Sequence, residues 1–310
     1  MYPIFFEQVS LLVRVLPTIS KEKCFALKGG TAINLFIRDM PRLSVDIDLA
    51  YLPIQDRNES LENINLALNK ISKHIQYTIP NIQITPSFLQ NSNKCIRLTL
   101  RQKNIQIKIE VTPVLRGSVH APIEREISPS AIKDFGYVKM QLLSFEDLYG
   151  GKLCATLDRQ HPRDLFDISL LLKNEGIGTK LKNTFLVYLL SHHRPIAEIL
   201  NPKWKNIEEL YEKEFKGMTR DEVSLKELIE TREKLIKIIY SLLDEKDLKF
   251  LSTFKSGKPI WNLFAFPKAA NLPAIRWKLY NIMKMSQKKR KTAQEKLEEV
   301  LNLIAKTNKN

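Results

Sequence analysis

The chain has 310 residues, of which 44% are apolar and 27% charged, an ordinary globular composition that gives room for two modest domains. No apolar run approaches the roughly 20 residues that span a bilayer, and the N-terminus lacks the basic region of a signal peptide. We therefore expect no membrane contact and a cytoplasmic location. The three cysteines are widely spaced without a Cys-x-x-Cys pair, which argues against a disulfide framework or structural zinc. The net charge of +15 favours a polyanionic partner such as a nucleic acid, although a generally lysine-rich surface gives the same excess.

The first predicted elements lead to and from a pair of glycines. Residues 4–16 have the apolar spacing of a helix, and residues 23–28 form a short apolar approach to Gly29 and Gly30. A helix is predicted over 31–38, with its first residue, a threonine, able to act as the N-cap. A turn signal, Asp-Met-Pro, ends this helix.

The next stretch, residues 43–52, alternates in the manner of a half-buried strand. Its apolar side chains point one way and its polar side chains the other. The apolar set is Val45, Ile47 and Leu49, and the polar set is Ser44, Asp46 and Asp48.

The remaining pattern divides the chain into two parts. A helix over 59–75 is followed by strands at 82–88, 95–100 and 105–111. From Ser144, where Ser-x-x-Asp resembles a capping box, the pattern is mostly helical. We therefore predict the α+β class, with an α/β domain at 1–143 that has a mixed sheet and a mainly helical domain at 144–310.

The acidic pair in the 43–52 strand is the first candidate for chemistry. Asp46 and Asp48 are two residues apart, which places both carboxylates on one face about 7 Å apart along the chain. Like charges this close resist joint ionisation unless a cation joins them, and Mg²⁺ prefers carboxylate oxygens while leaving positions open for phosphates. Alone, Asp-x-Asp on an amphipathic strand is common, and its acids often have no functional role.

The glycine pair raises the specificity of this signal. In Lys28-Gly29-Gly30-Thr31, paired glycines at the start of a helix let the backbone approach a triphosphate closely. A tight strand-to-helix turn would use the same residues. Glycines, helix and acidic strand in this order and this close are much more specific than either motif alone.

Longer segments around these motifs resemble a known family. Leu27-Lys-Gly-Gly-Thr-Ala-Ile-Asn-Leu-Phe and Pro41-Arg-Leu-Ser-Val-Asp-Ile-Asp-Leu resemble the AbiEii/AbiGii (MenT-like) toxin family of polymerase β-like nucleotidyltransferases. Two later blocks fit the same family. They are Gly150-Gly-Lys-Leu-Cys-Ala-Thr-Leu-Asp-Arg with Pro162-Arg-Asp-Leu-Phe-Asp-Ile, and Asn271-Leu-Pro-Ala-Ile-Arg-Trp-Lys-Leu-Tyr-Asn. The similarity spans nearly the whole chain.

The resemblance implies a polymerase β-like fold and a set of site residues. Asp46 and Asp48 would bind Mg²⁺, while Lys152 would hold the triphosphate of an NTP. Asp167 would be an active-site acid, with Asp164 as the other candidate for that role. The alternative is a purely structural ion pair between Asp167 and Arg163 across one helical turn. Further nucleotide-binding candidates are Lys28, Gly29, Gly30, Thr31, Ser44, Arg159 and Arg163.

Glu110 has two interpretations. It alternates with apolar residues in the 105–111 strand, where polymerase β-like enzymes often place a third carboxylate that binds metal and deprotonates the attacking hydroxyl. A cross-strand salt bridge explains the same position. Two other motifs give weaker evidence of function. We expect no metal at His192-His193, because nothing else nearby in sequence completes a site, and the basic run at 288–291 is either a solvated tail or a contact for an RNA backbone.

We predict transfer of a nucleoside monophosphate from an NTP to an acceptor, with release of pyrophosphate. The resemblance implies that the acceptor is a tRNA 3′ end, that translation is blocked, and that a cognate AbiEi-like DNA-binding antitoxin accompanies the toxin. Three alternatives stay open: a degenerate module that binds RNA or a partner without catalysis, a kinase-like transfer of the γ-phosphate, and a small-molecule-modifying transferase.

Overall fold

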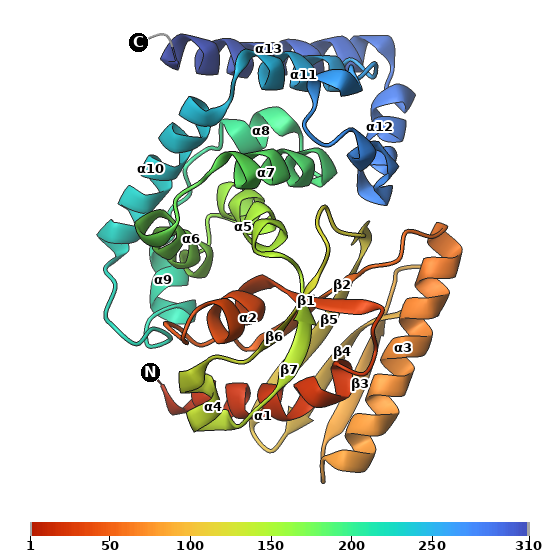
Figure 1. The fold of residues 1–310 in the computed structure, drawn as a ribbon, viewed down its shortest axis with the longest axis vertical. Helices are drawn as coiled ribbons and strands as arrows, with labels where there is room; N and C mark the ends of the chain where they lie inside the picture. Colours follow the sequence, from red (N-terminus) through yellow and green to blue (C-terminus); the bar gives the residue numbers. More distant parts are fainter. Residues whose placement is uncertain (1, 309–310) are drawn as a thin grey trace. The chain divides into compact units, whose positions relative to one another are not determined.

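Residues 2–308 are described by a computed structural model, in which the chain forms two units (Figure 1). The first runs to Leu148 and also includes Phe215–Val223. The second comprises Tyr149–Glu214 and the chain from Ser224 onward. The predicted α+β class is confirmed, because the first unit holds a mixed sheet and the second is helical. The domain boundary predicted after residue 143 stays a prediction.

A seven-stranded mixed sheet forms the centre of the first unit. Its order is β3-β4-β5-β2-β1-β7-β6, with parallel pairing for β2 with β5 and for β1 with β7, and antiparallel pairing elsewhere. The central strand β2 therefore lies between β1 and β5. The strands are β1 (Phe25–Lys28), β2 (Asp46–Tyr51), β3 (Gln83–Phe88), β4 (Cys95–Gln102), β5 (Ile105–Arg116), β6 (Ile123–Glu126) and β7 (Lys139–Leu142).

Two long helices pack against this sheet. Helix α1 (Pro3–Ile19) contacts β5 and β7, and α3 (Arg57–Thr78) contacts β3, β4 and β5. The short α4 (Pro129–Phe135) also contacts α1. Both long helices bury an apolar stripe because their apolar residues recur at helical spacing. The predicted helices at 4–16 and 59–75 are thus present and somewhat longer.

The helix after the glycine pair differs from the prediction. It begins at Gly29 instead of after Thr31, with α2 (Gly29–Ala32) passing into a π-helical turn, η1 (Ile33–Ile37). Thr31 is therefore not an N-cap. Its Oγ1 donates across to the main-chain carbonyl of Asp46 at 2.5 Å, because the residue lies inside the helix and faces the strand.

The segment Phe215–Val223 supports the chain just before β2. The main-chain N–H of Leu43 donates to the carbonyl of Met218 at 2.8 Å, and that of Arg220 donates to the carbonyl of Pro41 at 2.9 Å. Arg42 and Thr219 form an isolated antiparallel bridge between these hydrogen bonds. A piece of chain from the helical half of the sequence thus fixes the residues that lead into the acidic strand.

The second unit is built from helices that follow the predicted pattern. The start of α10 carries a full capping box, with Ser224 and Glu227 each accepting from the other's main-chain N–H. No helix within residues 2–308 combines the length and apolar character needed to cross a bilayer. The helices are α5 (Phe145–Arg159, which begins in the first unit), α6 (Pro162–Asn174), α7 (Thr179–Ser191), α8 (Ile196–Leu200), α9 (Glu208–Glu214), α10 (Leu225–Leu242), α11 (Glu245–Lys255), α12 (Pro273–Lys284) and α13 (Gln287–Thr307), with 3₁₀ turns η2 (Trp261–Leu263) and η3 (Pro267–Asn271).

Candidate active site

Four charged residues form a row across adjacent strands of the first unit. Lys28 of β1 is the register partner of Asp48 in β2, Asp48 is the partner of Glu110 in β5, and Glu110 is the partner of Arg97 in β4. Directly paired residues of neighbouring strands project to the same face of a sheet. The row therefore reads cation, acid, acid, cation, with the two carboxylates in the middle.

Asp46 lies on the same face, one pleat earlier in β2. Its register partner is Lys108 of β5. Asp46 and Asp48 are both half-buried, whereas the intervening Ile47 and the following Leu49 are fully buried. The predicted alternation is present over Asp46–Leu49, where it anchors the strand in the core and keeps the acids accessible to solvent. It does not extend to the predicted bounds 43–52, because the strand runs from Asp46 to Tyr51 and Ser44 is buried.

Gly29 lies directly against the carboxylate of Asp48. A Cβ at this position would stand 2.5 Å from Asp48 Oδ2, and the glycine has a φ of 73°. L-residues with a side chain rarely adopt that φ, and a methyl group this close to an oxygen would clash. Glycine is therefore required twice here, by backbone conformation and by the approach of the carboxylate.

Gly30 closes a second tight contact. A Cβ there would lie 2.7 Å from Arg42 Nη2 and 2.8 Å from Ser44 Oγ. Thr31 Oγ1, which donates to Asp46 O, lies 3.1 Å from Ser44 Oγ. The side chains of Arg42, Ser44 and Thr31 are buried, so this polar cluster ties the glycine turn to the start of β2. The two glycines thus let the turn pack closely against Asp48, Arg42 and Ser44, where any Cβ would meet atoms already present.

Of the two interpretations of Glu110, the structure confirms the cross-strand salt bridge, and the role as a third metal ligand and base stays a prediction. Its Oε2 accepts from Nε of Arg97 at 3.0 Å and lies 2.8 Å from Nη2 of the same guanidinium, so the cross-strand salt bridge is present. The carboxylate is also beside Asp48 in the strand register. Both contacts fall on Oε2, which leaves Oε1 without a hydrogen bond to any residue in the described range 2–308.

The hydrogen bond from Arg97 to Glu110 and the nearby negative charge raise the pKa of the arginine above its usual range. The carboxylates of Asp46 and Asp48 contribute to this rise. Both partners of the salt bridge keep 40% of their side-chain surface exposed. The three carboxylates thus create a negative potential that raises the pKa of Arg97, and the Arg97–Glu110 pair remains accessible to water.

This donor set fits a hard divalent cation. Asp46, Asp48 and Oε1 of Glu110 offer carboxylate oxygens on one face, and the glycine turn packs directly against Asp48. Mg²⁺ is bound through one or two carboxylates together with substrate phosphates. The residues present therefore match the chemistry of such an ion.

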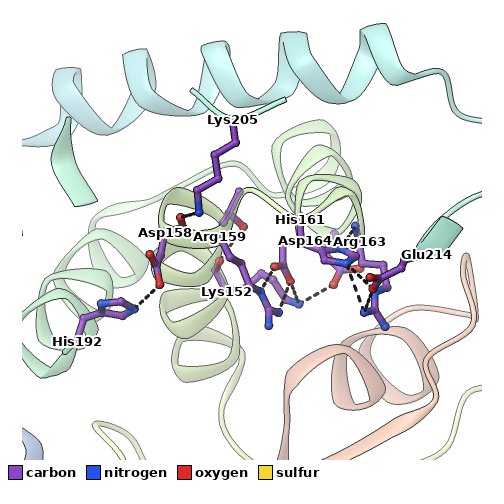
Figure 2. Close-up of polar contacts among 11 residues, drawn as sticks. Lys152, Asp158, Arg159, His161, Arg163, Asp164, His192, Lys205 and Glu214 are labelled. Atoms are coloured by element: carbon purple, nitrogen blue, oxygen red, sulfur yellow. Dashed lines mark hydrogen bonds and ion pairs between the residues drawn. The ribbon is translucent and has the colours of Figure 1, made fainter. Parts of the chain in front are cut away.

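The helical unit carries a separate, buried ionic cluster (Figure 2). Lys152 of α5 places its Nζ 2.8 Å from Asp164 Oδ1 and 2.9 Å from Asp167 Oδ2, both on α6. The lysine side chain is 5% exposed and the two aspartates are at most 1% exposed. Asp167 therefore contacts Lys152, and the other candidate, Asp164, occupies an equivalent position.

Asp164 also accepts two hydrogen bonds from Arg159. The guanidinium donates from Nε to Oδ2 at 2.5 Å and from Nη2 to Oδ1 at 2.9 Å. Burial acts to raise the pKa of Asp164, but the charge of Lys152 and the contacts of Arg159 outweigh it and hold the pKa well below its ordinary value of 3.8. Asp164 is therefore an ionised carboxylate that two cations neutralise inside the protein.

Arg163 lies at the outer side of this cluster. Its Nη2 is 3.2 Å from Glu214 Oε2, and its main-chain N–H donates to Nδ1 of His161, the N-cap of α6. Because Nδ1 accepts, the neutral tautomer of His161 carries its proton on Nε2 and donates to Glu214 at 3.1 Å. Burial lowers the pKa of His161, which agrees with that neutral form.

The two adjacent histidines do have a third potential ligand, which corrects the sequence interpretation. Asp158 of α5 lies near both His192 and His193, with one ligand atom of each residue within 4.8 Å of the others. The local sequence hid this because Asp158 comes from a different helix. The carboxylate is held by Arg194, whose Nη1 lies 2.6 Å from Oδ1, and this cation disfavours an added metal ion.

Comparison with known proteins identifies the family. The family model described as "Nucleotidyl transferase AbiEii toxin, Type IV TA system" matches residues 10–279, most of the chain. The chain belongs to this family. It is thus a nucleotidyltransferase from a family of toxins of type IV toxin–antitoxin systems, as the sequence motifs predicted, and membership implies an NTP substrate and an antitoxin partner.

A solved structure supports the fold. MenT4, a nucleotidyltransferase toxin from Mycobacterium tuberculosis H37Rv, matches with a TM-score of 0.57 and 12% sequence identity, over 89% of this chain and 91% of that chain. At this identity the likeness concerns the fold alone. A comparison with curated proteins gives no match.

Arg97 is the residue of this AbiEii family member that sequence reasoning missed. The strand at 95–100 is readable from the sequence, but its pattern alone does not align its outward residues with those of the following strand. The buried Leu98 and Leu100 flank Thr99, which places Thr99 and Arg97 together on the opposite face. A hairpin register between 95–100 and 105–111 brings Arg97 opposite Glu110, and this pairing was the available signal.

Proposed function

We propose that the chain transfers a nucleoside monophosphate from an NTP to the 3′ end of a tRNA and releases pyrophosphate. The observation that carries this proposal is the contact of Gly29 with Asp48 on a face that also presents Asp46 and Glu110. Clustered carboxylates beside a closely packed glycine turn suit a metal-bound triphosphate.

The candidate site residues of the first unit each have a definite role in this proposal. Gly29 and Gly30 let the backbone approach the phosphates, and Ser44 and Thr31 fix the glycine turn against β2. The acceptor hydroxyl attacks the α-phosphorus in line, a new oxygen–phosphorus bond forms, and the bond to the pyrophosphate oxygen breaks. Oε1 of Glu110 takes the proton of the attacking hydroxyl.

Asp46 and Asp48 would hold the Mg²⁺, with Glu110 as a third donor. When bound, this ion supplies positive charge that stabilises the negative charge developing on the phosphate oxygens and the leaving group. Lys28, the register partner of Asp48, provides a second positive group at the nucleotide side of the row.

Lys152 and Asp167 remain proposed site residues on the strength of the family pattern, as do Arg159 and Arg163. Within the helical unit the Lys152 ammonium already has two carboxylate partners. A substitution of Lys152 therefore changes stability as well as NTP use, and the two effects must be measured apart.

The choice of tRNA as acceptor and of an AbiEi-like antitoxin as partner rests on family membership and on charge. The net charge of +15 supports a polyanionic acceptor over a small neutral molecule. Modification of the tRNA 3′ end blocks aminoacylation and hence translation, which is an effect expected of a toxin.

The decisive experiment incubates the purified protein with total tRNA and NTPs labelled at the α- or the γ-phosphate. We expect RNA to acquire label from the α-labelled NTP alone, and the Asp48→Ala variant to transfer none. The exposed Asp134 of α4 supplies the matched control, since Asp134→Ala removes an acid from the same unit without touching the row.

Transfer of the γ-label would replace the proposal with a kinase-like reaction. Transfer of the α-label only to members of a small-molecule panel, and not to RNA, would establish a small-molecule transferase. If a folded protein labels nothing with either NTP under all acceptor conditions, a binding module without catalysis would be the better description.

A further inference from the structure

The positive charge of the chain is concentrated in one segment. Between residues 248 and 294 the sequence has no Asp or Glu, yet it contains eleven Lys and Arg. This acid-free segment covers most of α11, the whole of α12 and the start of α13. It alone holds much of the excess that gives the chain its net charge of +15.

Helix α12 shows two different faces within this segment. Its Ile275 and Ile282 are buried. Lys278 also turns inward, where Nζ donates to the main-chain carbonyls of Leu189, His192 and Arg194. The opposite face carries exposed aromatic, basic and amide side chains at helical spacing, namely Arg276, Trp277, Tyr280, Asn281 and Lys284.

The aromatic side chains of that exposed face are ordered as a stack. The rings of Trp277 and Tyr280 have centroids 5.5 Å apart and an interplanar angle of 22°. Nζ of Lys284 lies 4.5 Å from the centroid of the Tyr280 ring, one turn further along the helix. Trp277 is 54% exposed and Tyr280 46% exposed, which is a large apolar area to leave in water.

The basic run of α13 continues this surface along the chain. Met285 and Ser286 separate the two helices, and Ser286 caps α13 by accepting from the main-chain N–H of Lys289. The first turns of α13 carry Lys288, Lys289, Arg290 and Lys291. Stacked rings are thus followed directly by a cluster of cations.

We propose that this surface, defined by Trp277, Tyr280, Lys284 and the basic run 288–291, binds single-stranded RNA. Unpaired bases stack on exposed aromatic rings, and lysine and arginine follow the phosphates. The inference rests on the proposed RNA acceptor and adds a surface of the helical unit that holds an unpaired stretch of such an RNA.

Charge argues for RNA over a protein partner. The central part of protein interfaces is depleted in lysine, whereas this surface combines its aromatic rings with a dense set of lysines and no acid in the same segment. Binding of a polyphosphate chain releases counterions for every phosphate neutralised, so the same lysines favour a nucleic acid.

The test measures binding of a fluorescently labelled single-stranded RNA that ends in CCA, without NTP and with EDTA present. We expect Trp277→Ala combined with Tyr280→Ala to weaken binding by at least about tenfold, the effect of losing base stacking. Tyr77→Ala is the matched control, because Tyr77 is an exposed tyrosine on α3. Trp277→Phe, which retains a ring, should recover most of the affinity, and circular dichroism verifies the fold of each variant.

The basic run has its own readout. Substitution of residues 288–291 by Gln should flatten the dependence of log affinity on log salt by about 0.7 for each phosphate that the protein no longer neutralises. A blunt RNA duplex should bind more weakly than the single strand, since its bases are not free to stack.

Wild-type affinity in the folded Trp277→Ala, Tyr280→Ala variant would overturn the inference. It would also be overturned if the variant changed only the oligomeric state or the binding of a protein while RNA affinity stayed constant. The assay uses no NTP or metal, so it is separate from the transferase test: RNA binding at this surface is measured whether or not the protein transfers a nucleotide.

Discussion

Two clusters of acidic and basic side chains, one on the sheet and one in the helical unit, are built in opposite ways. On the face of β2, half-buried carboxylates are neighbours of one another and water reaches them. In the helical unit, Asp164 and Asp167 are sealed from water, and Lys152 lies between them. Clustered like charges that stay accessible suit a ligand that arrives and leaves, whereas a buried and balanced cluster suits a permanent structural link.

The largest effect is expected for Asp48→Ala. We expect nucleotide transfer to fall by at least about ten thousandfold, because the change removes a proposed metal ligand that supplies several kcal/mol of charge stabilisation. Thermal stability should change little, since Asp48 is half-buried and belongs to no ion pair with a described residue. Turnover with labelled NTP and the melting temperature measure the two outcomes. Wild-type turnover in this variant would remove the proposed centre from β2.

The matching change in the helical unit is Lys152→Met. It leaves Asp164 and Asp167 without the ammonium that joins them, and breaking a buried pair in this way costs about 3–5 kcal/mol. Urea unfolding measures this loss, with the exposed Lys246→Met on α11 as the control. The KM for NTP, taken at a temperature where the variant is folded, reports any additional role in substrate binding. An unchanged free energy of unfolding would contradict the structural role.

Gly29→Ala tests how closely the glycine turn and the acid are fitted. The new methyl group would lie 2.5 Å from Asp48 Oδ2 and must push the carboxylate away. Displacement of a catalytic group by about 1 Å lowers turnover by about a hundredfold. Gly136→Ala is the control for backbone strain alone, since Gly136 also has a positive φ, of 95°, but no atom within 4 Å of the added methyl. Equal effects of both changes on kcat would show that strain, and not the contact, matters.

Acid should lower the free energy of unfolding through the buried cluster of the helical unit. The pKa of Asp164 is lowered in the folded protein, so its ionised carboxylate stabilises the fold at pH values above the ordinary pKa of 3.8. This stabilisation is lost as the pH falls below 3.8 towards the lowered pKa of the folded state. On the order of 2–3 kcal/mol should disappear between about pH 5 and pH 2. Unfolding of the wild type and of Asp164→Asn across this range measures it. The variant should start less stable at pH 7 and lose less on acidification; parallel curves would contradict this assignment.

The smallest effect is expected for Arg97→Gln. The salt bridge with Glu110 is 40% exposed on both sides, so its loss should cost at most about 1 kcal/mol of stability. Turnover should change only about threefold to tenfold, because Glu110 keeps its place in the strand while its charge becomes less screened by a cation. Arg101→Gln, on the same face of β4, is the control. A loss as large as that of Asp48→Ala would make Arg97 a catalytic residue.

Local patterns predict the elements that local forces determine. The alternation around Asp46 and Asp48, the glycine pair and the serine that starts α5 are all readable within ten residues, and each is present. The pattern also favours Thr31 as a cap, because a threonine before an apolar helix usually takes that role. In the structure it lies inside the helix, since the helix already starts at Gly29 and the hydroxyl bonds across to the strand.

Contacts between distant segments are beyond this kind of reasoning. The pairing of Arg97 with Glu110 depends on the register of a hairpin, and the approach of Asp158 to His192 depends on how α5 packs near the end of α7. Nothing in the composition of 215–223 indicates that it pairs with residues 41–43. Such contacts follow from the folded backbone, which sequence periodicity describes only within one element.

The late return of Phe215–Val223 to the chain before β2 has a consequence for synthesis on the ribosome. The first unit is otherwise complete at Leu148, yet its last backbone partners arrive only after the intervening helices have been made. At about 5–20 residues per second this delay lasts roughly 3 to 15 seconds. During that interval the residues leading into the acidic strand lack these backbone hydrogen bonds. The nucleotide-handling half of this toxin therefore reaches its final form only when roughly 70% of the polypeptide has been translated.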